Sequence, residues 1–264
     1  MKPDIIMQVC VFVDYPLWRR WLEKYRNHFN KVILYPSRHH GVIDLQKFLE
    51  EQVKETWVND HVIDWTTPNI DWRMAEVTPC LDYVESDWIW FMEPDFFVRD
   101  WDRFFNDAQK LMGKSDTFGW WNETNFPYVH PCCLFIKREL LDRTNKDFRA
   151  HSEINGADHF AMVTHDAKKL GAKIIKLQDV GYVEWEDAFH LGGLTYPYQD
   201  FKGDDTIIGV KNPEAFMVYN RYSVLAPVVQ SPEYEGLSKN LEEVLMKKYV
   251  LTDEVINKWK EFYI

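Results

Sequence analysis

Cysteine is among the residues this sequence has least of: Cys10, Cys80, Cys132 and Cys133 are the four present in 264 residues. So few cysteines exclude a disulfide-built scaffold in a chain of this length. Their spacing also matches no common zinc-binding pattern. Cys132 and Cys133 are adjacent in an apolar run, so we interpret them as buried structural thiols, with a reactive thiol as the alternative.

Long hydrophobic runs are absent as well. No stretch of about 18 apolar residues occurs, so the sequence predicts no transmembrane helix. The opening segment MKPDIIMQVCVFV has the pattern of a short strand and contains no small-residue cleavage site, which argues against a signal peptide. We therefore expect a cytoplasmic protein without a membrane span.

Positive charge is in deficit. Lys and Arg number 31 against 42 Asp and Glu, which gives a formal net charge of −11. An acidic average works against long-range attraction of a polyanion, although a local basic groove could still form. Nucleic acid is therefore a disfavoured partner.

Apolar residues, by contrast, make up 46% of the chain and aromatic residues 16%, which is enough for one large core. Some of the many rings are expected to line a binding surface. We expect one domain over residues 1–236, with a C-terminal appendage of helices over 237–264. Residues 191–236 are rich in Gly, Pro, Asp and Tyr and lack periodicity, so we predict an ordered loop that acts as a lid over the site.

Strand and helix patterns alternate along much of the chain. Apolar runs bounded by turn residues predict strands, and apolar positions that recur at three and four residues predict helices. The predicted strands are 5–13, 31–35, 61–65, 88–92, 118–121, 132–136 and 173–177. The predicted helices are 18–29, 45–53, 72–83, 101–111, 139–143, 158–170, 237–249 and 252–263. This order indicates an α/β protein with an open, mostly parallel sheet flanked by helices.

Two acids, Glu93 and Asp95, follow directly after the apolar strand 88–92. In an extended turn, side chains two positions apart can point the same way and bind one hard divalent cation. The alternative is a solvated acidic turn, but such a turn has no need of the hydrophobic residues that crowd both of its sides. Ligands of open α/β sheets bind beyond the carboxyl ends of the strands, so Asp14, after the first strand, would lie nearby.

The segment WIWFMEPDFFV resembles the Asp-x-Asp region of the GT-A glycosyltransferases, with Glu93 in place of the first Asp. Upstream, Trp72-Arg73 and Ser86-Asp87-Trp88 are similar to that family's approach to the same strand. The resemblance implies the Rossmann-like GT-A fold. It also implies Mn²⁺ or Mg²⁺ bound by Glu93 and Asp95, with Asp95 the firmer choice of the two.

The activity that this resemblance implies is metal-dependent transfer of a sugar from a nucleoside diphosphate sugar, foremost a UDP sugar, to a hydroxyl group. The cation would neutralise charge on the departing diphosphate. Asp14, Tyr15 and Arg73 would contact the nucleotide.

A second segment, FHLGGLTYPY, resembles the element His-x-x-Gly-x-x-Lys-Pro-Trp that closes the site in some retaining members of the superfamily. The histidine of that element is a metal ligand, so the resemblance makes His190 the third ligand. A structural histidine is the alternative. Tyr196 stands where the family has lysine, and Lys202 or Lys211 on the predicted lid could replace that lysine at the diphosphate.

Asp158 opens the predicted helix 158–170, where it could simply be an acid favoured by the helix dipole. In inverting members of the superfamily, an acid at a similar place deprotonates the acceptor hydroxyl. The resemblance therefore also allows Asp158 as the catalytic base. If the reaction retains configuration, Asp158 becomes a positioning residue; we favour inversion.

Trp120, Trp121 and His130 flank a segment, 122–129, that lies where donor and acceptor sugars meet in this superfamily. Flat indole faces suit the C–H surfaces of sugars, and His130 could hydrogen-bond a hydroxyl. Core packing is the alternative for one of the two tryptophans.

Two other classes of protein stay open. One is a nucleotide-sugar or carbohydrate-binding protein without turnover, which the departures at Glu93 and Tyr196 favour. The other is a metal-dependent nucleotidyltransferase, which the absence of glycine from VFVDYPLWRR disfavours. For the enzyme, the expected acceptor is a glycan or polysaccharide first and a hydroxymethylated DNA base of phage type second.

Overall fold

The computed structural model describes residues 1–9, 15–36, 60–62, 77–93, 95–151, 153–191, 212–224 and 251–263. The predicted helices over 45–53 and 237–249 lie outside these ranges, and so does the predicted domain boundary at 236. Of the predicted helix 72–83, the described part is helical over 77–80 and continues as a 3₁₀ turn, η2 (Leu81–Tyr83).

Seven strands form one open sheet in the order β3-β2-β1-β4-β7-β6-β8. β7 is antiparallel to both of its neighbours, and every other pair is parallel, so six strands run in one direction. The mostly parallel sheet predicted from the sequence is thus confirmed. In the order of the sheet, the strands are β3 (Asp60–Val62), β2 (Val32–Pro36), β1 (Asp4–Val9), β4 (Trp88–Met92), β7 (Tyr128–Lys137), β6 (Thr117–Asn122) and β8 (Ile174–Lys176).

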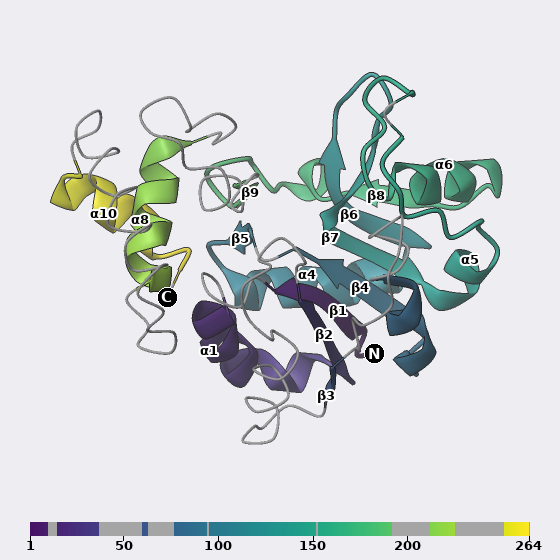
Figure 1. Cartoon of the computed structure of the whole chain (residues 1–264), viewed down its shortest axis with the longest axis horizontal. Coiled ribbons are helices and arrows are strands. Elements are labelled where there is room, and N and C mark those ends of the chain that lie inside the picture. Colours follow the sequence, from purple (N-terminus) through teal and green to yellow (C-terminus); the bar gives the residue numbers. More distant parts are fainter. Residues whose placement is uncertain are drawn as a thin grey trace.

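Helices cover both faces of this sheet (Figure 1). One face packs into a core with α1, α4, α8 and α10, and the other packs with α5 and α6. The helices are α1 (Tyr15–Tyr25), α4 (Trp101–Met112), α5 (Arg138–Asp142), α6 (Ala161–Lys169), α8 (Pro213–Val224) and α10 (Asp253–Lys260). Short 3₁₀ turns, η1 (Arg26–His28) and η3 (Gln178–Val180), follow α1 and β8.

Side-chain N-caps in the local sequence explain where α4 and α10 begin. The Asp100 side chain accepts a hydrogen bond from the Arg103 N–H at 2.9 Å and caps α4, whose apolar positions face the core. Thr252 caps α10 in the same way, through the Val255 N–H at 3.2 Å, as predicted from the sequence.

A second, two-stranded sheet lies between the main sheet and the C-terminal helices (Figure 1). It pairs β5 (Phe96–Val98) with β9 (Ala188–His190) in antiparallel fashion. The ring of Phe97 packs against Tyr219 of α8 and against Tyr263, at centroid distances of 5.5 and 4.8 Å. These aromatic contacts hold the C-terminal helices against the strand pair.

The structure corrects the sequence analysis at two helices. Residues 191–236 were predicted to be loop, but α8 occupies 213–224 within that range. The helix predicted from residue 158 begins at Ala161 instead. Phe160, the residue before it, has a left-handed backbone with φ 63°, which cannot continue a right-handed helix toward Asp158.

A large bulge interrupts the pairing of β6 with β7. Gly119 pairs with Leu134 and Trp121 pairs with Val129, so Trp120 alone on β6 faces residues 130–133 on β7. Bulges bend a strand and redirect its side chains, and they are frequent beside active sites. This bulge lies next to the carboxyl end of β4, because the Glu93 N–H donates to the Cys132 carbonyl at 3.3 Å.

Candidate metal and active site

Glu93 and Asp95 occupy the connection between β4 and β5, as their position in the sequence predicts. Hydrophobic strands on both sides bury this connection, so the two side chains are only 12% and 10% exposed. The interpretation as a solvated acidic turn is therefore wrong. Two largely buried carboxylates side by side require a positive partner, because an unpaired buried charge is strongly unfavourable.

His190, at the end of β9, supplies that partner. Its Nε2 lies 3.1 Å from Asp95 Oδ1 and 3.5 Å from Glu93 Oε2. Pairing of β5 with β9 fixes this arrangement, since Phe96 is opposite His190 and the Leu191 N–H donates to the Asp95 carbonyl at 2.8 Å. The structure thus brings together the three residues predicted as metal ligands, although they are about a hundred positions apart in sequence.

The geometry and charge of this cluster fit a divalent cation. One ligand atom from each of the three residues lies within 4.8 Å of the others. Two ligands at right angles on a cation with bonds of about 2.1 Å lie about 3 Å apart, close to the two distances from His190. Two carboxylates and an imidazole suit Mn²⁺ or Mg²⁺, with remaining positions left for phosphate oxygens.

The protonation of His190 responds to the same charges. Burial lowers the pKa of His190, but Asp95 and then Glu93 raise it by charge and hydrogen bonding, and the resulting pKa is about 9. His190 therefore carries a proton at neutral pH when no cation is bound. A cation that binds through this ring has to displace the proton.

His130 and Cys132 extend the cluster from the bulge of β7. His130 Nδ1 lies 3.8 Å from Glu93 Oε2, and the His130 and His190 rings are 4.4 Å apart between centroids. Ligand atoms of His130, Cys132 and His190 also lie within 4.8 Å of one another. His130 was predicted to hydrogen-bond a sugar hydroxyl, and Cys132 was interpreted as a structural thiol with a reactive thiol as the alternative; neither was predicted as a metal ligand. The His-x-Cys spacing on an extended segment was the sequence signal for their shared position.

Trp120 and Trp121 are both buried. Trp120 lies in the core against Phe96, at a centroid distance of 5.7 Å, which is the packing role left open for one of the two. The ring of Trp121 is 9% exposed and lies beneath the ammonium groups of Lys168 and Lys176, at 4.7 and 4.5 Å. A role of either ring in sugar binding stays a prediction.

Asp158 lies in an exposed turn before α6, with 57% of its side chain accessible. Its carboxylate accepts the His159 N–H at 2.7 Å. The pKa of the buried Tyr128 is raised by burial first, then by the charge of Asp158, and also by that of Glu93. Asp158 is therefore near β7, the same strand that carries His130 beside Glu93 and His190.

The residues predicted to bind the nucleotide are only partly described. Asp14, Arg73 and Lys202 lie outside the described residues, as does most of the predicted lid. Tyr15 is the first residue of α1, and its contact with the nucleotide stays a prediction.

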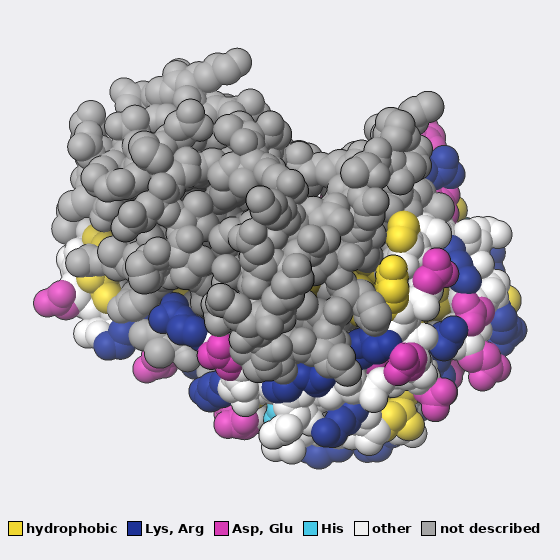
Figure 2. All heavy atoms as spheres, turned by 60° about the horizontal axis from the view of Figure 1, so that its bottom comes forward, with side chains coloured by type: hydrophobic (Ala, Val, Ile, Leu, Met, Phe, Trp, Pro, Cys, Tyr) yellow, Lys and Arg dark blue, Asp and Glu magenta, His cyan; other side chains and the backbone are white. Residues whose placement is uncertain are grey.

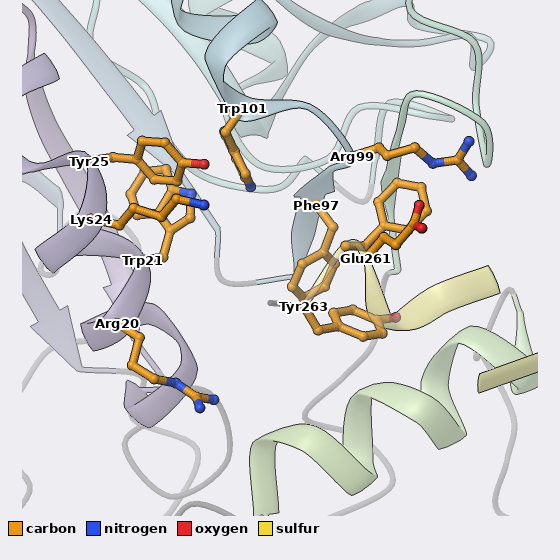
Figure 3. Close-up of a pocket in the computed structure, with 10 residues that line it drawn as sticks. Arg20, Trp21, Lys24, Tyr25, Phe97, Arg99, Trp101, Glu261 and Tyr263 are labelled. Carbon is orange, nitrogen blue, oxygen red and sulfur yellow. The ribbon is translucent and has the colours of Figure 1, made fainter. Parts of the chain in front are cut away.

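A separate pocket of about 210 Å³ lies between α1 and the C-terminal residues (Figure 3). Arg20 and Lys24 of α1 flank one side of it, and Phe97 and Tyr263 flank the other. Asp95 directly precedes β5 and Phe97 lies in the middle of this strand, so β5 connects the pocket to the candidate metal site. None of the described residues predicted for the site lines the pocket.

Comparisons with known proteins identify the fold. No protein-family model matches the sequence, and no curated protein matches it in sequence. The structure is similar to the mannosyltransferase PcManGT from Pyrobaculum calidifontis, solved in complex with GDP-mannose and Mn²⁺. The two share 13% identity and a TM-score of 0.50 over 98% of this chain and 74% of that one.

Two further solved structures are similar to a lower degree. S. aureus TarS 1–349 has 12% identity and a TM-score of 0.49, over 98% of this chain and 78% of that one. HddC from Yersinia pseudotuberculosis has 11% identity and a TM-score of 0.39, over 66% of this chain and 89% of that one. The strand order, the acids after β4 and the similarity to the mannosyltransferase together show that this chain has the GT-A fold.

Proposed function

We propose that this protein is a metal-dependent glycosyltransferase that moves a hexose from a nucleoside diphosphate sugar to an acceptor hydroxyl. The observation that carries the proposal is the convergence of Glu93, Asp95 and His190 at the carboxyl end of β4. In open α/β sheets this end is where ligands bind. The fold supports the same proposal, since a protein with this fold was solved with GDP-mannose and Mn²⁺.

In this proposal the three side chains hold the cation and thereby orient the diphosphate. The bound cation supplies Lewis-acid neutralisation of the charge on the departing diphosphate. Asp14, Tyr15 and Arg73 contact the nucleotide, and Lys202 contacts the diphosphate, as the resemblance implies.

Asp158 is the proposed base. It takes the proton of the acceptor hydroxyl as the new bond forms between the acceptor oxygen and the anomeric carbon and the bond from that carbon to the diphosphate breaks. An exposed carboxylate suits this role, because an acceptor can reach it from solvent. A single displacement of this kind inverts the anomeric configuration.

The acceptor we propose first is a glycan or polysaccharide. On the face shown in Figure 2, basic and acidic side chains are interspersed over the described part of the surface. A polyanion is held best by clustered positive charge, so the described part of this face does not favour nucleic acid. A hydroxymethylated DNA base stays second. Among the described residues, no helix has the length and apolar character needed to cross a bilayer.

A donor screen tests the proposal. The protein is incubated with Mn²⁺ or Mg²⁺ and a panel of UDP and GDP sugars, and release of the nucleoside diphosphate is followed beside the variants Asp95→Asn and Asp82→Asn. Metal-dependent release that is lost in Asp95→Asn and kept in Asp82→Asn, whose side chain is exposed outside the cluster, would support the enzyme and name the donor. Nucleotide-sugar binding without release from any donor would favour the binding protein instead.

A further inference from the structure

The bulge of β7 places a second set of ligands beside the proposed cation site. His130, Cys132 and His190 have ligand atoms within 4.8 Å of one another, as do Glu93, Asp95 and His190. His190 belongs to both sets. One set offers two carboxylate oxygens and one nitrogen, whereas the other offers two nitrogens and one sulfur.

The hydrogen bond to His130 indicates which of its ring nitrogens carries no proton. Its Nδ1 accepts the backbone N–H of Cys132 at 3.1 Å. This nitrogen therefore carries no proton, and a metal bound to it would take over the lone pair that now accepts the Cys132 N–H. The same Nδ1 is the atom that faces Glu93 at 3.8 Å, so it points toward the cluster.

Ligand type decides which cation each set prefers. Carboxylate oxygens favour hard cations such as Mn²⁺ and Mg²⁺, whereas imidazole with thiolate is typical of Zn²⁺. Three protein ligands with one open position is a common arrangement for Zn²⁺. The buried surroundings of His130 and Cys132 also exclude competing water.

We propose that His190 serves two alternative cation positions and that Zn²⁺ binds at His130, Cys132 and His190. On binding, the Cys132 thiol and the His190 imidazolium each release one proton to solvent, and the resulting thiolate and imidazole donate to the metal. Because a neutral imidazole has one lone pair for a metal, His190 can bind one cation at a time, so Zn²⁺ at this position displaces the cation held with Glu93 and Asp95. Zn²⁺ is therefore an inhibitor, a consequence that rests on the proposed function.

Cobalt spectroscopy of the full chain tests the site without any assay of activity. Co²⁺ substitutes for Zn²⁺, and a thiolate ligand gives it a charge-transfer absorption band in the near ultraviolet. We expect this band in the wild type and in Asp95→Asn, and we expect Zn²⁺ to abolish it by displacing Co²⁺. Cys132→Ser should lose the band and weaken Zn²⁺ binding roughly tenfold or more.

Cys133→Ser is the matched control, because Cys133 is the adjacent buried thiol and pairs with Met92 outside the cluster. Cys80→Ser is a second control in another part of the core. Both should keep the band. Bound Co²⁺ without the band in the wild type would overturn the proposal whatever the variants do, and so would a band that persists in Cys132→Ser.

The outcome is independent of whether the protein is an enzyme. A thiolate band with no turnover of any donor would support this site and contradict the proposed function. Turnover of a donor with Mn²⁺ but no thiolate band would support the proposed function and contradict the Zn²⁺ site.

Discussion

Gly119 of β6 lies directly against the backbone of Cys133 on β7. A Cβ atom at position 119 would overlap the Cys133 carbonyl oxygen and would lie 2.6 Å from Val129 Cγ1. The contact is this close because the bulge begins here, and the same bulge carries His130 and Cys132. Glycine at this position therefore allows the strand geometry on which the second ligand set depends.

Replacing Gly119 by alanine should destabilise the protein by about 1–3 kcal/mol or more, because backbone atoms cannot move aside as a side chain can. The measurement is the free energy of unfolding in urea. Gly113→Ala is the control, since its Cβ would meet only the Lys110 carbonyl at 3.5 Å, an ordinary contact. Equal stability of the two variants would show that the bulge is not as tight as described.

Removing the charge of Asp95 should weaken the binding of Mn²⁺. Asp95→Asn leaves the side-chain shape intact but removes one of the two negative charges of the oxygen ligand set, so the affinity measured by calorimetry should fall at least about tenfold. The exposed Asp82→Asn should bind as the wild type does. Unchanged Mn²⁺ affinity in Asp95→Asn would remove this residue from the site.

The stability of the metal-free protein should decrease with rising pH between about 6.5 and 9. Burial lowers the pKa of His190, yet Asp95 and Glu93 raise it to about 9 from the ordinary value of 6.5. The stabilisation by protonated His190 is therefore complete below pH 6.5 and is lost as the pH rises through 9.

Urea unfolding in the presence of a chelator, at a series of pH values, measures this dependence. His190→Gln should flatten it over that interval. His165→Gln, which alters a histidine of α6 that packs against Phe126, should leave it in place. If the wild type, His190→Gln and His165→Gln all lose stability equally with rising pH, the pH dependence does not come from His190.

Asp158→Asn should reduce sugar transfer by about 100-fold or more, the usual contribution of a general base. Because Asp158 is not a ligand of the cluster, the affinity for Mn²⁺ should not change. Asp142→Asn on α5 has a similarly exposed carboxylate, 53% against 57%, and should transfer normally. Product analysis by NMR gives the anomeric configuration, and retention would assign Asp158 a positioning role instead.

Several features could be predicted from the sequence because they depend on neighbours along the chain. The apolar run Trp88–Met92 predicted a buried strand, and all five residues are buried. Thr252 predicted a helix start, since a threonine hydroxyl satisfies the free N–H groups of the first turn. The acids after β4 and the histidine before Leu191 were predicted as one site through the resemblance, and they do converge.

Other features depended on residues distant in sequence. No local sequence pattern predicts that Phe96 pairs with His190 or that α8 packs on β5 and β9. Both features arise from contacts between segments that are far apart in the chain. The start of α6 also differed from prediction, since the left-handed Phe160 is held by burial in the core rather than by its own preference.

The sequence by itself determined the alternation of strands and helices that builds the main sheet, the buried strand that ends in two acids, and the histidine of the candidate metal site. Only the tertiary structure decided what surrounds that site. His130 and Cys132 enter it because four residues of β7 are accommodated opposite one residue of β6. The register between two strands is set by packing across the whole sheet, so the local sequence of either strand does not determine it.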